Sequence, residues 1–502
     1  MEIFGGLTHG FAVALTPVNL VYAAIGAILG TAIGVLPGLG PPATIALLLP
    51  ATYKIDATSA VIMVSGIFYG AMYGGSTTSI LLNIPGEAAS VVTCLDGYKM
   101  ARQGRAGAAL GISAMGSFIA GTLGLVGLSV LAPPLAAFAL KFGPPEYFAL
   151  ILMGLMMAIY LSEGSPLKGL MMAATGLILG MVGLDPVQGA DRFTFGLPKL
   201  TDGFDFVVVA MGLFGVAEVL CNVEAPEVRD IFQTALKKLL PTREDWRRCW
   251  ASVARGSFLG FFIGILPGGG AIISSFMAYA VEKRVSKHPE QFGHGAIEGV
   301  AAPESANNAA ASSSFIPLLT LGIPGNASIA MIFVALMIHG IRPGPMLLQE
   351  HPDLFWGAVA SMYIGNAMLL ALNLPLIGLW VRLLKVPYNF LAAGVLLFCI
   401  IGAYSVNNSA FDVGSVIAFG AVGYVLRKGG FPAAPLVLAM ILGPQLERTL
   451  QQSLIGAGGD PRTFLQHPIS ATLLLATTGL ILSPAVRWLW QQYRKGRVLK
   501  AA

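Results

Sequence analysis

A glycine-rich apolar stretch occurs twice in the chain, and this repeat limits what the sequence can fold into. Residues 26–40 read GAILGTAIGVLPGLG and residues 256–270 read GSFLGFFIGILPGGG, so the glycines and the Leu-Pro-Gly-x-Gly ending fall at the same steps. An α-helix cannot run on through Pro-Gly-x-Gly, because proline lacks an N–H donor and glycine opens left-handed backbone angles. Two helices broken at matching places in the two halves of an apolar chain are typical of the central site of a transporter.

The composition predicts an all-α polytopic membrane protein. Of the 502 residues, 55% are hydrophobic and only 11% are charged, whereas a soluble protein has about 25% charged residues. Many apolar runs approach the roughly 20 residues that a spanning helix needs. The net charge of +5 is small and lies in loops, which argues against a nucleic-acid partner. The four cysteines are scattered without a CxxC pair, so neither a disulfide framework nor a metal cluster is predicted.

We assign residues 1–222 to the first repeat. The break after residue 36 leaves only half a span before residue 50, so we predict a re-entrant hairpin over 18–50 with its tip at 37–41. Non-helical backbone at membrane depth needs protein or a wet cavity around it. A broken helix is predicted over 58–90, with its break at Gly74–Ser79. Further spans are expected near 107–131, 146–162, 167–183 and 205–222, and the short segment 8–16 is left open as an extra span.

The second half repeats this order over residues 256–490. We predict a hairpin over 254–281 with its tip at 267–270, and a broken helix over 296–337 interrupted through Pro303–Asn308 and Ser312–Ser314. Spans are then expected near 355–382, 388–404, 411–426, 431–446 and 468–490. Residues 223–255 form a basic linker, expected to be an amphipathic helix on the cytoplasmic surface, where anchoring competes with partner docking. Residues 491–502 form a basic cytoplasmic tail.

The basic loops set the orientation. Placing them in the cytoplasm makes the two hairpins enter from opposite sides, so the halves become inverted repeats with 11 crossings, or 12 if residues 8–16 span. The C-terminus is then cytoplasmic and the N-terminus lies on the other side. Inverted repeats place a substrate near the middle of the membrane and support alternating access.

The predicted lining of such a site is neutral. It consists of backbone, hydroxyls and amides at Gly38, Gly40, Gly75, Ser76, Thr77, Thr78, Ser79, Gly268, Gly269, Gly270, Asn307, Asn308, Ser312, Ser313 and Ser314. Helix N-termini after a break present unpaired N–H groups that suit an anion such as a carboxylate, and unwound carbonyls suit Na⁺. The alternative is that these small residues only allow close helix packing.

Two carboxylates lie beside the predicted breaks, Glu87 and Glu304. A carboxylate near membrane depth is costly and is a functional hypothesis by default. Glu304, with Asn308 and Thr77, is the candidate for ion coupling. Glu304 as a helix cap or as a residue at the cytoplasmic mouth is the competing interpretation.

These strings together resemble the TctA family, the large membrane subunit of the tripartite tricarboxylate transporters. The resemblance rests on residues 34–41, 73–79 with 83–87, 303–310 and 319–325, and it extends over the whole chain. It implies a multi-pass protein of the bacterial inner membrane that imports citrate-like or other small carboxylates with Na⁺ or H⁺ as the coupling ion and no other cofactor. It also implies a small membrane subunit and a periplasmic solute-binding protein as partners. A homo-oligomer is left open.

Other classes are disfavoured by what the sequence lacks. An anion channel would also use broken helices, but opposed hairpins favour alternating access. An intramembrane enzyme is a further alternative, although the chain has no HExxH or GxGD motif. We therefore expect a transporter and not an enzyme. Nor does the chain contain the GxxxxGK[ST] motif of an ATP-driven pump.

Overall fold

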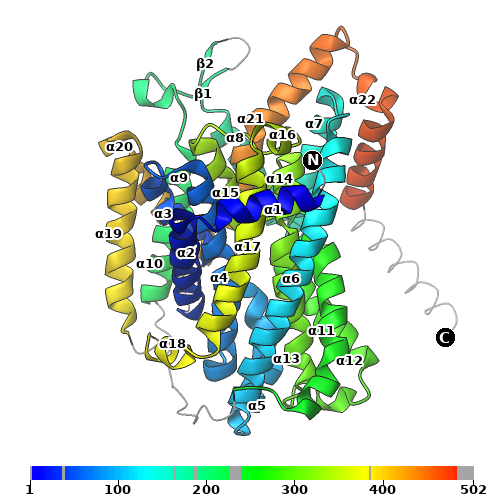
Figure 1. The fold of residues 1–502 in the computed structure, drawn as a ribbon. Coiled ribbons are helices and arrows are strands. Elements are labelled where there is room, and N and C mark those ends of the chain that lie inside the picture. The colour runs from blue at the N-terminus through cyan, green and yellow to red at the C-terminus, as the bar shows by residue number, and fades with distance from the viewer. Residues whose placement is uncertain are drawn as a thin grey trace, which may run out of the picture.

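The computed structural model describes residues 3–36, 40–161, 165–185, 189–224, 239–268, 270–383 and 386–482. Within these ranges the chain is almost entirely helical, which confirms the prediction of an all-α polytopic protein (Figure 1). The first half contains α1 (Ile3–Ala14), α2 (Pro17–Val35), α3 (Pro41–Thr52), α4 (Ala57–Leu82), α5 (Val91–Arg102), α6 (Ala106–Ala139), α7 (Pro144–Leu161), α8 (Pro166–Gly180), α9 (Phe206–Ala210) and α10 (Ala217–Glu224). A two-residue pair, β1 (Gly183–Leu184) with β2 (Asp191–Arg192), lies in the loop after α8.

The second half contains α11 (Arg243–Gly264), α12 (Gly270–Val285), α13 (Glu298–Ser313), α14 (Phe315–Leu321), α15 (Ala327–Ile338), α16 (Leu347–Glu350), α17 (Pro352–Asn373), α18 (Ile377–Leu383), α19 (Tyr388–Asn407), α20 (Ala410–Lys428), α21 (Ala433–Gly456) and α22 (Thr463–Gln466). A further apolar helix covers Pro468–Leu482. Short helical turns η1 (Ala88–Ser90), η2 (Pro198–Leu200) and η4 (Pro289–Gln291) lie between these helices, and a π-helical stretch, η3 (Met211–Val216), joins α9 to α10.

Eight helices in the described ranges are long and apolar enough to cross a membrane. They are α2, α4, α6, α7, the stretch Phe206–Glu224, α17, α19 and α20. Shorter apolar helices include α1, α3, α8, α15 and Pro468–Leu482. Helix α1 lies crosswise to the long helices in Figure 1, and its 12 residues cover about 18 Å, well short of the roughly 30 Å of a bilayer core. The count of 11 to 12 crossings stays a prediction.

Glycines bring α2 and α4 into backbone contact. A Cβ on Gly26 would meet the backbone of Met63 and Gly66, and a Cβ on Gly34 would meet Ala71 and Gly75. The contacts advance along both helices together, so α2 and α4 run in the same direction. The chain must therefore reverse twice between them, and α3 is the returning arm. This is the path of the predicted hairpin over 18–50, although tip residues 37–39 lie outside the described ranges.

The second unit is built in the same way. Gly256 packs on Ala302, Gly260 on Ala306, and Gly264 on Ala310 of α13. Helices α11 and α13 are therefore parallel, and α12 returns between them and packs on both.

The two units point in opposite directions. Ser76 of α4 contacts Glu304 of α13, whereas Phe68, earlier on α4, packs against Phe315, which follows α13, with ring centroids 6.0 Å apart. Residue numbers thus rise along one helix as they fall along the other. This is the relative orientation that an inverted repeat requires.

The predicted position of the helix breaks is wrong. Helix α4 continues through Gly74–Ser79 to Leu82, and the hydroxyls of Thr78 and Ser79 are satisfied without a break because they donate to the carbonyl of Gly75 within the helix. Helix α13 likewise runs through Pro303–Asn308 to Ser313, with only a turn at Ser314 before α14. The real interruptions are the matching strings 83–87 and 322–326.

The predicted linker is also placed differently. Residues 225–238 lie outside the described ranges, and Arg243 already begins α11 behind a capping box formed by Thr242 and Asp245. The second part of the 223–255 segment is therefore the start of the long α11 helix, not a separate surface helix. Trp250, at 65% exposed, still points outward.

Cysteine labelling tests the arrangement of the two ends. Lys287 and Glu350 are both exposed. The loop after α12 lies beside the end of α5, where Gln103 donates to the carbonyl of His294. The loop after α15 lies beside the turn that precedes α4, where His339 contacts the backbone. Each substitution, Lys287→Cys or Glu350→Cys, is made in a variant without native cysteines and treated with an impermeant maleimide. One of the two positions should react in right-side-out vesicles and the other in inside-out vesicles. Labelling of both from one side would contradict this orientation.

The glycine contacts make a stability prediction. A Cβ on Gly30 would lie 2.5 Å from the carbonyl oxygen of Ile67 and 2.9 Å from the Cα of Gly70, so the backbones must separate. We expect Gly30→Ala to destabilise the protein by about 1–3 kcal/mol, seen as a lower melting temperature of the purified protein. Gly394→Ala is the control, because nothing lies within 4 Å of that position on α19. Equal melting temperatures for the two variants would show that the glycine contacts carry no packing constraint.

Candidate functional site

A buried carboxylate lies where α4 and α13 cross. Glu304 is 1% exposed, and its two carboxylate oxygens accept hydrogen bonds from Ser76 of α4 and Thr93 of α5. Ser113 of α6 also hydrogen-bonds this carboxylate. Three helices of the first half therefore surround one acid from the second half. The hydroxyls stabilise the charge, but none of them balances it.

A second carboxylate lies beside the first. Glu87 follows the interruption after α4 and caps η1, because its Oε2 accepts the backbone N–H of Ala89 at 2.6 Å. Its Oε1 accepts a hydrogen bond from Nδ2 of Asn307 at 3.1 Å. Asn307 is fully buried, and its Oδ1 has no hydrogen-bond partner in the part of the chain that the structure describes.

The two acids lack the ion pairs that most other buried carboxylates form, although Asp96 and Asp412 also have no basic partner within the described ranges. Five of the others form ion pairs, namely Glu146 with His467, Asp185 with Arg192, Asp245 with Arg105, Glu282 with Arg255 and Glu298 with Arg248. Among the residues with a described position, Glu304 and Glu87 have no such basic partner. An unbalanced carboxylate in a low-dielectric interior costs several kcal/mol. A proton or a cation would offset that cost.

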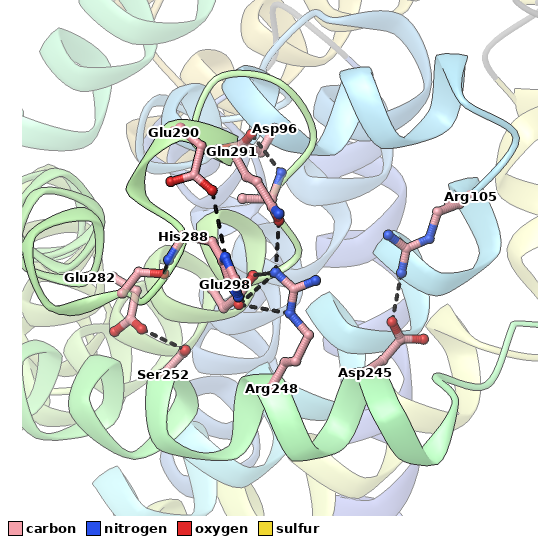
Figure 2. A network of polar contacts seen from close by, with 12 residues as sticks. Asp96, Arg105, Asp245, Arg248, Ser252, Glu282, His288, Glu290, Gln291 and Glu298 are labelled. Carbon is pink, nitrogen blue, oxygen red and sulfur yellow. Dashed lines mark hydrogen bonds and ion pairs between the residues drawn. The ribbon is translucent and has the colours of Figure 1, made fainter.

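Figure 2 shows how other buried acids are held at the end of the molecule formed by α5 and the start of α13. Arg248 donates to both carboxylate oxygens of Glu298, at 2.9 and 3.0 Å, and also to Gln291. Asp96 of α5 is fully buried and accepts backbone N–H groups of Gly293, Gly295 and Ala296 at 2.7–2.9 Å. These contacts fasten the first half of the chain to the second close to Glu304.

Each hairpin meets the interruption of its own unit. The N–H of Gly268 donates to the carbonyl of Gly325 at 2.6 Å, and the backbone of Gly86 packs on Gly34 and Gly75. Gly268 has φ +109°, which favours glycine. Its N–H is used inside the protein, so in this conformation it is not presented to an anion.

The structure brings together only part of the predicted lining. Ser76 reaches Glu304, Asn307 reaches Glu87, and Asn308 donates to Ser117 at 2.7 Å. Other predicted residues bond to carbonyls close by in sequence: Thr78 and Ser79 to Gly75, Ser312 to Asn308, Ser313 to Ala310 and Ser314 to Ala311. Ser79 also contacts the hydroxyl of Ser90, and Ser312 also contacts the carbonyl of Gly121 on α6. Thr77 is buried in α4, Gly40 precedes α3, and Gly270 begins α12. Gly38 and Gly269 lie outside the described ranges.

A small cavity lies one turn further along α13. Its lining includes Tyr69, Tyr73, Asn308, Ser312 and Asn366, and its volume is about 20 Å³. This is room for about one water molecule, not for a carboxylic acid of several carbons. The hydroxyl of Tyr73 donates to Oδ1 of Asn366 at 2.8 Å, while the buried Tyr69 hydroxyl has no partner within the described ranges.

Several polar residues at this centre were not predicted from the sequence. Thr93, Ser113, Tyr73 and Asn366 belong to helices α5, α6, α4 and α17. Tyr73 directly precedes the Gly74–Ser79 string but was not assigned a role, and the other three are isolated hydroxyl or amide residues among several in their helices, so no local pattern distinguishes them. Only the packing of α4, α6, α13 and α17 assembles them.

The fold and this centre define a multi-pass membrane protein with two opposed helical units around buried, unbalanced carboxylates. The chain matches the model of the tripartite tricarboxylate transporter TctA family over residues 20–438. The chain belongs to that family.

Two relatives come from Agrobacterium vitis. An "uncharacterized 52.8 kDa protein in TAR-I ttuC' 3'region" is 52% identical over 490 residues, which cover 97% of this chain and 98% of the relative. An "uncharacterized protein in TAR-II ttuC' 3'region" is 52% identical over 231 residues, 45% of this chain and 96% of the relative. No solved structure matches the chain.

Two tyrosines of the cavity make a matched stability test. Tyr73→Phe removes the donor to Asn366 and leaves a buried acceptor unpaired, which we expect to cost about 1–3 kcal/mol. Tyr69→Phe removes a hydroxyl without a partner and should leave the melting temperature unchanged or raise it. A loss with Tyr69→Phe as large as with Tyr73→Phe would show that an ordered water or ion binds the Tyr69 hydroxyl.

Proposed function

We propose that the protein is the large membrane subunit of a secondary carrier that imports a tricarboxylate or another small carboxylate, driven by a coupled cation. Substrate would arrive from a periplasmic solute-binding protein, and a small membrane subunit would complete the complex in the bacterial inner membrane. Membership of the TctA family supports the class of substrate and the additional subunits.

The environment of Glu304 is the observation that supports coupling of transport to a cation. Its carboxylate is buried between the two opposed units, with hydroxyls from α4 and α5 and no basic partner in the described ranges. A bound Na⁺ or proton would remove the cost of the buried charge. Because both units contribute to this centre, a change in their packing would alter the affinity for the cation. That dependence is the physical basis of coupling.

The anion would be recognised without a buried arginine. The predicted lining residues are neutral; the interruption at 83–87 lies beside this centre, and the one at 322–326 meets the turn after α11 at Gly268. Oriented N–H groups and hydroxyls bind carboxylates at such breaks. A cavity of about 20 Å³ is too small for the acid, so we interpret this conformation as closed. Alternating access would then open the site to one side at a time.

Uptake into vesicles tests the proposal. The complete three-component complex is reconstituted, and uptake of radiolabelled citrate and other di- and tricarboxylates is measured under an imposed Na⁺ gradient or pH gradient. We expect one gradient to drive uptake of at least one acid. No uptake under either gradient by a demonstrably assembled complex would overturn carboxylate transport.

The coupling residue has its own test. Glu304→Gln keeps the size of the side chain and one acceptor oxygen, replaces the other oxygen by an NH2 donor, and removes the charge. We expect uptake to fall at least tenfold, or to lose its dependence on the driving cation. Glu290→Gln is the control, because that side chain is 67% exposed and should leave uptake unchanged. Identical ion dependence in wild type and Glu304→Gln would exclude Glu304 from coupling.

A further inference from the structure

The two helix interruptions are built alike but end in different residues. Residues 83–87 read NIPGE and residues 322–326 read GIPGN. Each begins with a left-handed residue, Asn83 at φ 60° and Gly322 at φ 70°. Each ends with a residue that caps the following helix: Glu87 accepts the N–H of Ala89, and Asn326 accepts the N–H of Ile329 at 3.0 Å.

Capping therefore does not explain the charge of Glu87. At the equivalent position a neutral asparagine caps the next helix, and asparagine is among the best capping residues. Glu87 is 8% exposed, and its charge has no basic partner among the described residues. A buried charge that the local structure does not need costs free energy unless something balances it.

A second observation indicates what is missing. Asn307 directs Nδ2 at Glu87, and its Oδ1, on the other arm of the same amide, has no donor although the residue is fully buried. A buried amide oxygen without a donor is rare and calls for an explanation such as an ion. The unpaired oxygen and the unbalanced carboxylate belong to two groups in direct contact.

Glu304 lies close to this pair. Gly75 and Ser76 are consecutive on α4, and they contact Glu87 and Glu304 respectively. On α13, Glu304 and Asn307 are three residues apart and so share one face of the helix. Two carboxylates and one amide oxygen are thus brought together by two helices of opposite direction.

We propose that a Na⁺ ion binds between the carboxylates of Glu87 and Glu304, with Oδ1 of Asn307 as a neutral ligand. Carboxylate and amide oxygens are the ligands that hard cations prefer. The inference rests on the proposed cation-coupled function, and it assigns the cation, a second acid and the neutral ligand.

Direct binding tests this site without transport. The purified full-length chain is titrated with ²²Na⁺ in a scintillation proximity assay. In parallel, its melting temperature is followed in NaCl against choline chloride at constant ionic strength, because a ligand of the folded state raises it. We expect saturable ²²Na⁺ binding that neither K⁺, Mg²⁺ nor Ca²⁺ at the same concentration displaces. Absence of saturable Na⁺ binding, or displacement by a divalent cation instead, would overturn the proposal.

Glu87→Asn is the decisive variant, because it places in the first interruption the residue that already caps the second. We expect at least a tenfold loss of Na⁺ affinity, with a melting temperature in choline chloride no lower than that of wild type. Asn326→Ser is the matched control: serine retains capping ability in the other interruption, and Na⁺ affinity should not change. Na⁺ affinity within twofold of wild type in Glu87→Asn would show that Glu87 only caps η1.

Two further variants keep the test independent of folding and of the transported acid. Should Glu87→Asn not purify as a monodisperse protein, Glu87→Gln keeps the side-chain length and should show the same loss of Na⁺ affinity. Asn307→Ala removes the neutral ligand and should weaken binding as well, and unchanged binding in Glu87→Gln and Asn307→Ala would overturn the proposal. The binding assay contains no transported carboxylic acid, so its result can be interpreted even if the uptake experiment fails. Conversely, unchanged Na⁺ binding in these variants would not affect the conclusion drawn from uptake.

Discussion

Close backbone packing within each unit is the constraint on which the rest of the structure depends. In lipid, helices gain little from burying apolar side chains, so association relies on van der Waals contact and on small residues at the interface. Glycines of α2 lie directly on the backbone of α4, and glycines of α11 lie on alanines of α13. This contact fixes the position of α2 along α4 and of α11 along α13. The tip of the second unit therefore meets its own interruption, where Gly268 bonds to Gly325.

The same packing explains why a polar centre can exist at this depth. Helices α4 and α13 are covered on several sides, so hydroxyls, amides and two carboxylates face protein instead of lipid. Five other buried acids are paired with arginine or histidine, and buried Asp96 is held by backbone N–H groups. The two at the crossing are surrounded by hydroxyls and amides. A carrier needs such a difference, because a permanent ion pair would leave no place for an exchangeable cation.

The sequence predicted the units better than it predicted their interruptions. The duplicated glycine pattern identified α2 and α11 and the reversal after each, because a spacing of four residues maps onto one helix face. The break at Gly74–Ser79 was misplaced because glycine and hydroxyl residues were interpreted as helix breakers, whereas in a buried helix the hydroxyls bond to the carbonyl of Gly75. The strings at 83–87 (NIPGE) and 322–326 (GIPGN) are alike in sequence, but only the structure shows that they end the helices. Thr93 and Ser113 could not be predicted, since nothing local marks them.

The Asp96 carboxylate has a consequence for motion. It lies in α5, yet three backbone N–H groups before α13 and the hydroxyl of Tyr279 on α12 all donate to it. Separating the two opposed units would strip a fully buried charge of four donors at once, at a cost of several kcal/mol. Contacts at this end therefore oppose complete separation of the two units. A change in their packing that keeps these four hydrogen bonds would have to pivot about Asp96, so residues far from this end would be displaced more than residues close to it.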